Sequence, residues 1–229
     1  MGKVGLNGNQ LKMIALITMT LDHVGLVLMH DFIPFRIIGR LSFPIFAFMI
    51  AQGCRYTRHK LKYFLQIFLL GILCQTVFYM TSKSLYQGIL ITFSLSILMI
   101  YAVQWAKKQD KRPAYLVPAA AIVLIFLLCE GLPMVLLTDF YVDYGFAGAL
   151  LPVLVYLPAG RKQQLFFAGL GLLAVCITMG GYQWYSLFAL LLLFFYNGEK
   201  GKGSIKYGFY IYYPVHLAVI YVLAELFIY

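Results

Sequence analysis

The sequence predicts an all-α polytopic membrane protein, a bundle of about nine spanning helices that forms a single domain over residues 1–229. Hydrophobic residues make up 62% of the chain and charged residues 11%, whereas soluble domains are closer to half apolar and a quarter charged. A spanning helix needs about 20 mostly apolar residues. The runs that approach this length are 11–29, 35–53, 61–80, 85–106, 113–130, 142–157, 163–179, 182–196 and 207–228.

Short polar or Gly/Pro-containing stretches separate consecutive runs, so no room is left for a soluble domain. The first two runs carry ionisable residues within their apolar sequence. The sixth run, 142–157, is short and contains Pro152, and we expect it to be kinked or partial. Four cysteines lie in or beside apolar runs without any C-x-x-C spacing. We expect them to pack as small apolar residues, and we expect no metal site.

The basic residues predict the orientation of the helices. Of the 18 Lys and Arg residues, all but Arg36, Arg40 and Lys83 fall in alternate loops, and the positive-inside rule places those loops in the cytoplasm. This pattern predicts a cytoplasmic N-terminus and an outer C-terminus. The net charge of +10 therefore reflects cytoplasmic loops beside membrane lipid, and no nucleic-acid partner is expected.

Asp22 and His23 lie next to each other within the first apolar run. Ionisable side chains are costly inside a bilayer and are therefore candidates for function. The rise from Lys12, at the start of the run, to His23 is about 16 Å at 1.5 Å per residue, which places His23 beyond the midplane on the outer side. An imidazole can accept and return a proton, so His23 is the candidate general base. The alternative is a hydrogen-bonded structural histidine.

Arg36 and Arg40 are one helical turn apart at the start of the second run, so an anionic group should lie near them. Asp22 and Asp31 are the candidates within the chain, and a lipid phosphate or a substrate is the candidate outside it. Successive residues on a helix do not face the same side. Asp22 is therefore expected to orient His23 only if the helix bends, or otherwise to form a buried ion pair with Arg36 or Arg40.

Two further positions are candidates for binding. Asp139 and Asp143 are four residues apart, so on a helix they would share one face and could bind a cationic or amine-bearing partner. The alternative for this pair is a helix cap and a solvated loop. His216, in F-Y-I-Y-Y-P-V-H-L, is a second intramembrane imidazole that shares a helix face with Tyr212. Its expected role is structural, with a catalytic role as the alternative.

A basic cluster, R-Y-T-R-H-K, follows the second run on the predicted cytoplasmic side. Such a cluster is usually a topology signal that also contacts anionic lipid. Arg55 and Arg58 are three residues apart within it, and arginines can bind phosphate oxygens through two parallel hydrogen bonds. The cluster is therefore also a candidate phosphate site.

Five segments carry a resemblance to a known family: L-K-M-I-A-L-I-T-M-T-L-D-H-V-G, R-I-I-G-R-L-S-F-P-I-F-A-F-M-I-A-Q-G, I-T-F-S-L, D-Y-G-F-A-G and Y-Y-P-V-H-L. In these segments the chain resembles the TraX family, named for a conjugation protein associated with N-acetylation of pilin. TraX proteins are similar to a wider superfamily of transmembrane acyltransferases, which take an acyl group from cytoplasmic acyl-CoA and use a membrane-embedded histidine. The resemblance implies a basic-x10-His motif at Lys12 and His23, and an R-x-x-R grip on CoA phosphates at Arg55 and Arg58.

Physical reading and resemblance together predict a multi-pass acyltransferase of the cell membrane that uses acetyl-CoA as donor. The acceptor would be an amine or a hydroxyl, for example the N-terminus of a pilin or of another exported partner. Asp22 would orient His23 or form an ion pair. The alternative is a small-molecule transporter with intramembrane Asp, His and Arg, although the sequence lacks the paired Gly/Pro-interrupted halves typical of transporters. A structural component without chemistry would not explain the buried charges of the first two helices.

Overall fold

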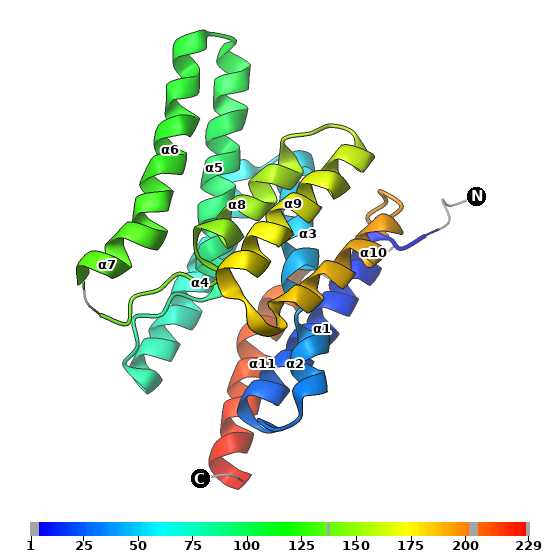
Figure 1. Ribbon diagram of the computed structural model, residues 1–229, viewed down its shortest axis with the longest axis vertical. Helices are drawn as coiled ribbons and strands as arrows, with labels where there is room; N and C mark the ends of the chain where they lie inside the picture. The colour runs from blue at the N-terminus through cyan, green and yellow to red at the C-terminus, as the bar shows by residue number, and fades with distance from the viewer. Residues whose placement is uncertain (1–4, 137, 202–205, 228–229) are drawn as a thin grey trace. The chain divides into compact units, whose positions relative to one another are not determined.

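The computed structural model describes residues 5–136, 138–201 and 206–227, and it consists of helices joined by short loops (Figure 1). Within these residues no β-strand forms, and the two isolated bridges pair Leu6 with Tyr196 and Gln87 with Val142. The predicted all-α class is confirmed. The helices are α1 (Gly8–Val27), α2 (Ile33–Gly39), α3 (Ser42–Tyr56), α4 (Lys60–Ser82), α5 (Ile89–Gln109), η1 (Arg112–Tyr115), α6 (Leu116–Phe126), η2 (Leu127–Gly131), α7 (Leu132–Leu136), α8 (Gly145–Tyr156), α9 (Arg161–Met179), η3 (Gly181–Phe188), α10 (Ala189–Phe194) and α11 (Lys206–Phe227).

Every predicted apolar run corresponds to a helical segment of the structure. Six segments are long and apolar enough to cross a membrane: Gly8–Val27, Ile33–Tyr56, Lys60–Ser82, Ile89–Gln109, Arg112–Leu136 and Arg161–Met179. The other three predicted runs correspond to the shorter apolar helices Gly145–Tyr156, Gly181–Phe194 and Tyr210–Leu226. The count of nine spans and the orientation of the termini stay predictions.

The second run is interrupted where the sequence analysis expected one continuous helix. α2 ends at Gly39 and α3 begins at Ser42. Pro44 stands in the first turn of α3, where its missing N–H is tolerated but cannot continue the hydrogen bonds of a preceding helix. The chain therefore turns at Arg40 and Leu41 before the helix resumes.

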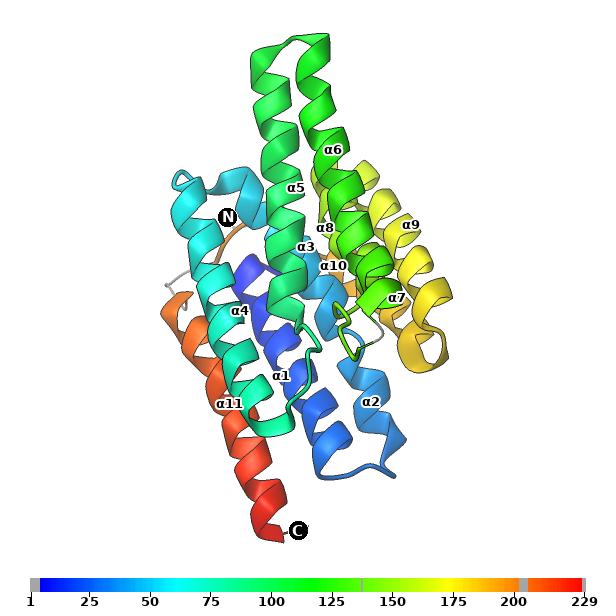
Figure 2. The same ribbon diagram turned by 90° about the vertical axis from the view of Figure 1, so that its left-hand side faces the viewer.

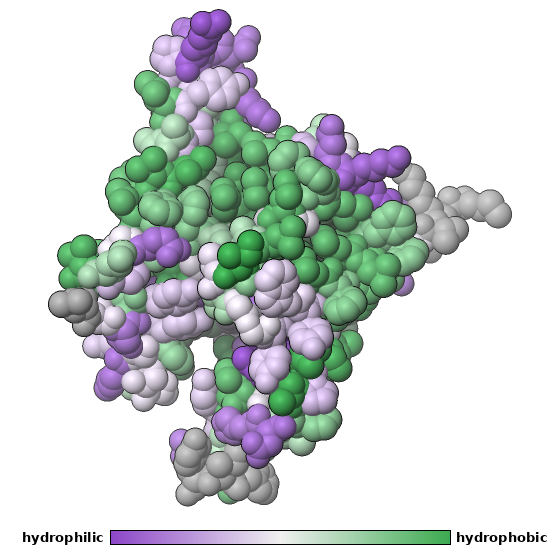
Figure 3. All heavy atoms as spheres, in the orientation of Figure 1, coloured by the Kyte–Doolittle hydropathy of each residue, from purple (hydrophilic) through white to green (hydrophobic). Residues whose placement is uncertain are grey.

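The exposed surfaces of α4 and α6 are apolar. Leu69 and Met80 of α4 are 59% and 67% exposed, and Leu124 of α6 is 66% exposed. Figure 3 shows hydrophobic residues along the hairpin of α5 and α6 and hydrophilic residues at its tip. Soluble proteins rarely expose large apolar patches, whereas lipid tails cover such surfaces. Together with the six long helices, these surfaces define a membrane protein.

The chain divides into two compact units, residues Met1–Met49 with Leu172–Tyr229 and residues Ile50–Gly171. In the second unit, α5 and α6 form an antiparallel hairpin (Figures 1 and 2), and α5 also packs against α4 and α8. The Ser96 hydroxyl donates to the Ala149 carbonyl at 2.7 Å, which ties α5 to α8. Since α3 and α9 contribute residues to both units, the single domain predicted for residues 1–229 stays a prediction.

In the first unit, α1 packs against both α2 and α11 (Figure 2). α1 begins at a capping box, in which the Asn7 side chain accepts from the Gln10 backbone N–H and the Gln10 side chain accepts from the Asn7 N–H. This reciprocal pair satisfies backbone donors that a helix start leaves unpaired. α1 thus carries Lys12, Asp22 and His23 on one unbroken helix.

Candidate functional site

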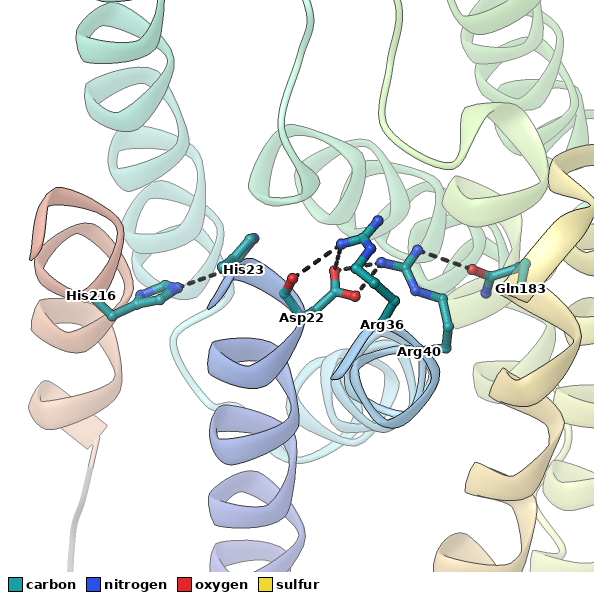
Figure 4. Close-up of polar contacts among 6 residues, drawn as sticks. All are labelled: Asp22, His23, Arg36, Arg40, Gln183 and His216. Carbon is teal, nitrogen blue, oxygen red and sulfur yellow. Dashed lines mark hydrogen bonds and ion pairs between the residues drawn. The ribbon is translucent and has the colours of Figure 1, made fainter. Parts of the chain in front are cut away.

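Asp22 and His23 point away from each other, toward different neighbours of α1 (Figure 4). His23 faces α11 and contacts His216, whereas Asp22 faces α2 and contacts Arg36 and Arg40. The helix does not bend to bring the two side chains together. Of the two roles that the sequence left open for Asp22, the structure contains the ion pair.

The two imidazoles form a hydrogen-bonded pair, with His23 Nδ1 2.9 Å from His216 Nε2. The other ring nitrogen of His216, Nδ1, lies 3.0 Å from the Tyr212 carbonyl oxygen. A carbonyl only accepts, so His216 Nδ1 carries a proton, and in a neutral ring Nε2 is then the acceptor. His23 therefore donates through Nδ1, which leaves the lone pair of a neutral His23 on its Nε2.

Tyr212 holds His216 in this orientation. The rings of Tyr212 and His216 stack with centroids 5.2 Å apart and planes 7° from parallel. The Thr20 hydroxyl lies 2.9 Å from the Leu16 carbonyl and 2.6 Å from the Tyr212 hydroxyl. Since Thr20 has a single hydroxyl proton and donates it to the carbonyl, Tyr212 donates to Thr20. This contact connects α1 to α11 about one turn before the imidazole pair.

The carboxylate of Asp22 binds two guanidinium groups. Arg36 Nη1 lies 2.9 Å from Asp22 Oδ2 and also donates to the Asp22 carbonyl at 3.1 Å. Arg40 Nη2 contacts both carboxylate oxygens. The side chains of Asp22 and Arg40 are each 15% exposed. Asp31, the other anionic candidate of the sequence, lies exposed in the loop before α2.

Sequence reasoning missed Thr20 and Gln183. Gln183 is buried at the start of η3 and lies 3.5 Å from Arg40 (Nη1 to Oε1), as Figure 4 shows. The available signal was a glutamine between two aromatic residues, two positions after Gly181. Thr20 had no comparable signal, because threonine is common in apolar helices, where its hydroxyl bonds to the preceding turn.

The predicted phosphate grip belongs to the other unit, residues 50–171. Arg55 Nη2 donates to the carbonyls of Tyr156 and Pro158 at 2.7 and 2.8 Å, so this guanidinium binds the carbonyls at the end of α8. Arg58 is exposed. Arg55 therefore stabilises the end of α8, whereas Arg58 lies at the surface.

Asp139 and Asp143 do not share a helix face, because both precede the start of α8 at Gly145. The Asp139 carboxylate accepts from the Leu85 backbone N–H at 3.0 Å. Hydrogen bonds to Ser84 and Leu85 hold the pKa of Asp139 below its ordinary value. The Glu130 carboxylate accepts from a backbone N–H in the first turn of α8, that of Phe146 at 2.8 Å. Asp139 and Asp143 therefore lie in the segment that precedes α8.

This geometry defines a class of protein: a helical membrane protein that holds a hydrogen-bonded imidazole pair beside an Asp–Arg cluster. The chain belongs to the TraX family, since the family model described as TraX protein matches residues 7–224.

The chain is also similar to two other proteins. The chain is 27% identical to a probable fimbrial assembly protein FimC, serogroup H1, of Dichelobacter nodosus, over 92% of this chain and 93% of that protein. It is 35% identical to an uncharacterised protein of Rickettsia prowazekii (strain Madrid E), over 40% of this chain and 35% of that protein. No solved structure matches the chain.

Proposed function

We propose that this protein is an acyltransferase of the cell membrane that moves an acetyl group from cytoplasmic acetyl-CoA to an acceptor amine or hydroxyl. The observation that carries the proposal is the imidazole pair, which assigns the free lone pair of His23 to Nε2. Membership of the TraX family and the fimbrial-assembly name of the Dichelobacter relative support a pilus-related acceptor. The N-terminal amine of a pilin is the first acceptor to test.

In the proposed reaction His23 is the general base. The acceptor nitrogen or oxygen attacks the thioester carbonyl while His23 Nε2 removes its proton. The new bond to the acetyl carbon forms, the carbon–sulfur bond breaks, and the thiolate of CoA takes up the proton from His23. A positioned general base contributes about 10²–10⁴-fold to such a step.

His216 is a positioning residue in this scheme. Its Nε2 accepts the Nδ1 proton of His23, which fixes the tautomer that leaves Nε2 able to act as a base. This hydrogen bond also fixes the orientation of the His23 ring, as bonds to carboxylates and carbonyls do for other functional histidines. Asp22 has no part in this proton transfer, because its carboxylate binds Arg36 and Arg40.

The donor site is proposed at the basic cluster that follows α3. Arg58 is exposed and available for a phosphate, and the basic residues His59, Lys60 and Lys62 follow it in the sequence. Charge-assisted contacts between arginine and phosphate predict salt-sensitive binding of acetyl-CoA. The segment from Lys107 to Arg112 is the second basic surface to test if this one does not bind.

The test uses the purified protein in detergent with radiolabelled acetyl-CoA and a synthetic peptide that begins with a free pilin-type N-terminus. We expect labelled peptide and an equal amount of released CoA thiol. His23→Ala should abolish both while retaining acetyl-CoA binding. His30→Ala is the matched control, because His30 is exposed in the turn that follows α1 and its loss should keep the parental rate.

Parental turnover by His23→Ala would reject His23 as the base. If no peptide, hydroxyl acceptor or water receives the acetyl group from the parent protein, the acyltransferase proposal fails. Uptake of a solute into vesicles that depends on Asp22 and His23 would then support the transporter.

A further inference from the structure

A cavity of about 180 Å³ lies within the first unit, next to the cluster of Asp22, Arg36 and Arg40. Its walls are the two arginines and residues 179–183, which join α9 to η3. The proposed acetyl transfer uses neither this cavity nor Gln183. The side chains around it are therefore open to a separate role.

Gln183 is held rigidly in the cavity wall. The Cys176 thiol donates to the Gln183 carbonyl at 3.3 Å, and the Gln183 N–H donates to the Gly180 carbonyl at 3.1 Å. The residue is 3% exposed. These two hydrogen bonds fix the backbone of Gln183, so its side chain stays in the cavity wall.

The side-chain amide of Gln183 has one unused end. Its Oε1 faces Arg40 Nη1 at 3.5 Å, and because a guanidinium only donates, this contact sets which end of the amide faces the arginine. The Nε2 group is buried without a hydrogen-bond partner among the residues that the structure describes. Buried polar groups are nearly always paired, so this donor calls for an acceptor in the cavity.

The charges of the cluster call for the same kind of ligand. Arg36 and Arg40 share one carboxylate, that of Asp22, which leaves one positive charge in excess among these three side chains. One additional negative charge would neutralise the cluster.

The backbone at the cavity mouth suits an anion as well. Gly180 and Gly181 have φ values of +63° and +51°, and no atom lies within 4 Å of where their Cβ atoms would stand. η3 continues directly into α10, and no side chain caps its first turn. Uncapped backbone N–H groups at a helix start favour negative charge.

We propose that this cavity binds one oxyanion, the carboxylate or phosphate group of a ligand. Arg36 and Arg40 supply the charge, Gln183 Nε2 donates one hydrogen bond, and the glycine turn admits the group. The source is either a free anion or the headgroup of an anionic lipid, since both present the same oxygens. This binding does not depend on acetyl transfer.

The experiment measures thermal unfolding of the purified protein in a neutral detergent. Inorganic phosphate and acetate are titrated against chloride at equal ionic strength, and phosphatidylglycerol is compared with phosphatidylcholine in mixed micelles. We expect at least one of the three anions to raise Tm in a saturable way, by about 2–4 °C or more for a chain of this size. A response to phosphate or acetate identifies a free anion, and a response to phosphatidylglycerol alone identifies the lipid headgroup.

Two substitutions of Gln183 make the test specific. Gln183→Glu supplies the missing negative charge, so it should raise Tm without added anion and should no longer respond to it. Gln183→Leu removes the donor and should weaken the response at least tenfold in the anion concentration required. Gln163→Glu, at an exposed glutamine, is the matched control and should respond like the parent.

Three results would overturn the proposal: no response of the parent to any anion, an equal response of Gln183→Glu and the parent, or loss of the response in Gln163→Glu. None of these results depends on acetyl transfer. A protein without transferase activity can still confirm the anion site, and an active enzyme can still refute it.

Discussion

Asp22 and His23 are neighbours on α1 that bind opposite sides of the first unit, Asp22 to the arginines of α2 and His23 to His216 of α11. Adjacent helical positions do not face each other, so a single helix can hold an ion-pair cluster and an imidazole pair in separate surroundings. Substitutions at the two positions should therefore have separable effects, one mainly on stability and one mainly on chemistry.

His216→Ala should slow acetyl transfer without abolishing it. The substitution removes the acceptor for the His23 Nδ1 proton, so His23 can adopt the tautomer that lacks a lone pair on Nε2. We expect kcat to fall by roughly 10- to 100-fold, the range that misplacement of a catalytic group produces, with KM for acetyl-CoA unchanged.

The conservative variant His216→Gln tests the positioning role directly. A glutamine carbonyl can accept from His23 Nδ1, so this variant should recover part of the rate lost in His216→Ala. Equal rates for the two variants would mean that His216 only fills space between α1 and α11.

Asp22→Asn should destabilise the protein. It leaves Arg36 and Arg40 beside each other without a carboxylate, and breaking a buried ion pair from one side costs about 3–5 kcal/mol. Unfolding measured in detergent checks this value. Transfer should be severely reduced through this loss of stability, but folded protein should keep some activity, because Asp22 does not touch His23.

A double-mutant cycle with Arg40→Gln separates the ion pair from other effects of Asp22→Asn. Removing Arg40 also removes the excess charge, so the double variant should be more stable than the sum of the single effects by about 0.5–3 kcal/mol. Strict additivity would show that the contact between these side chains contributes little.

Hydrophobic run lengths predicted every helical segment of the fold, because a membrane requires long apolar helices. The run that contains Arg36 and Arg40 looked continuous because its apolar residues pass through Gly39 and Pro44 without a gap. Pro44 is the local signal for the turn at Arg40 and Leu41. The close approach of Gly39 to Asp22 of α1 accompanies the turn, and the composition of the run does not encode that contact.

The site was predicted in part. Composition singled out Asp22, His23, Arg36 and Arg40 because buried ionisable residues are rare in membranes. The contact between His23 and His216 joins residues 193 positions apart, and no local pattern encodes such a pairing. Gln183 stands out locally as a glutamine among apolar residues, but its contact with Arg40 depends on α2 lying beside η3, which the sequence does not show.

Gly39→Ala should disrupt the first unit. A Cβ at Gly39 would overlap the backbone Cα and the side chain of Asp22, and a backbone atom cannot rotate away. Overpacking of this kind costs about 1–3 kcal/mol or more. Gly88→Ala is the control, since no atom lies within 4 Å of its Cβ position. Equal unfolding temperatures for the two variants would contradict the close approach of α1 and α2.

Arg55→Ala should lower stability, whereas Arg58→Ala should weaken binding of acetyl-CoA. Arg55 donates to two backbone carbonyls at the end of α8, and hydrogen bonds from charged groups contribute about 1.5–3 kcal/mol each, so its loss should lower stability. Arg58→Ala should keep stability and weaken acetyl-CoA binding, most strongly at low salt. Thermal unfolding and equilibrium binding of acetyl-CoA measure the two effects. Unchanged affinity in Arg58→Ala would move the phosphate site to the segment from Lys107 to Arg112.

The orientation in the membrane gives the last prediction. The bias of basic residues toward alternate loops places Lys108 and Arg161 in the cytoplasm and Asp139 with the C-terminus outside. All three side chains are exposed, so single cysteines at these positions should be open to labelling. The native cysteines are buried or half-buried, which keeps background labelling low.

A membrane-impermeant maleimide added to intact cells should label position 139 and leave 108 and 161 unlabelled until the membrane is opened. Labelling of position 161 from outside would refute the nine-span topology.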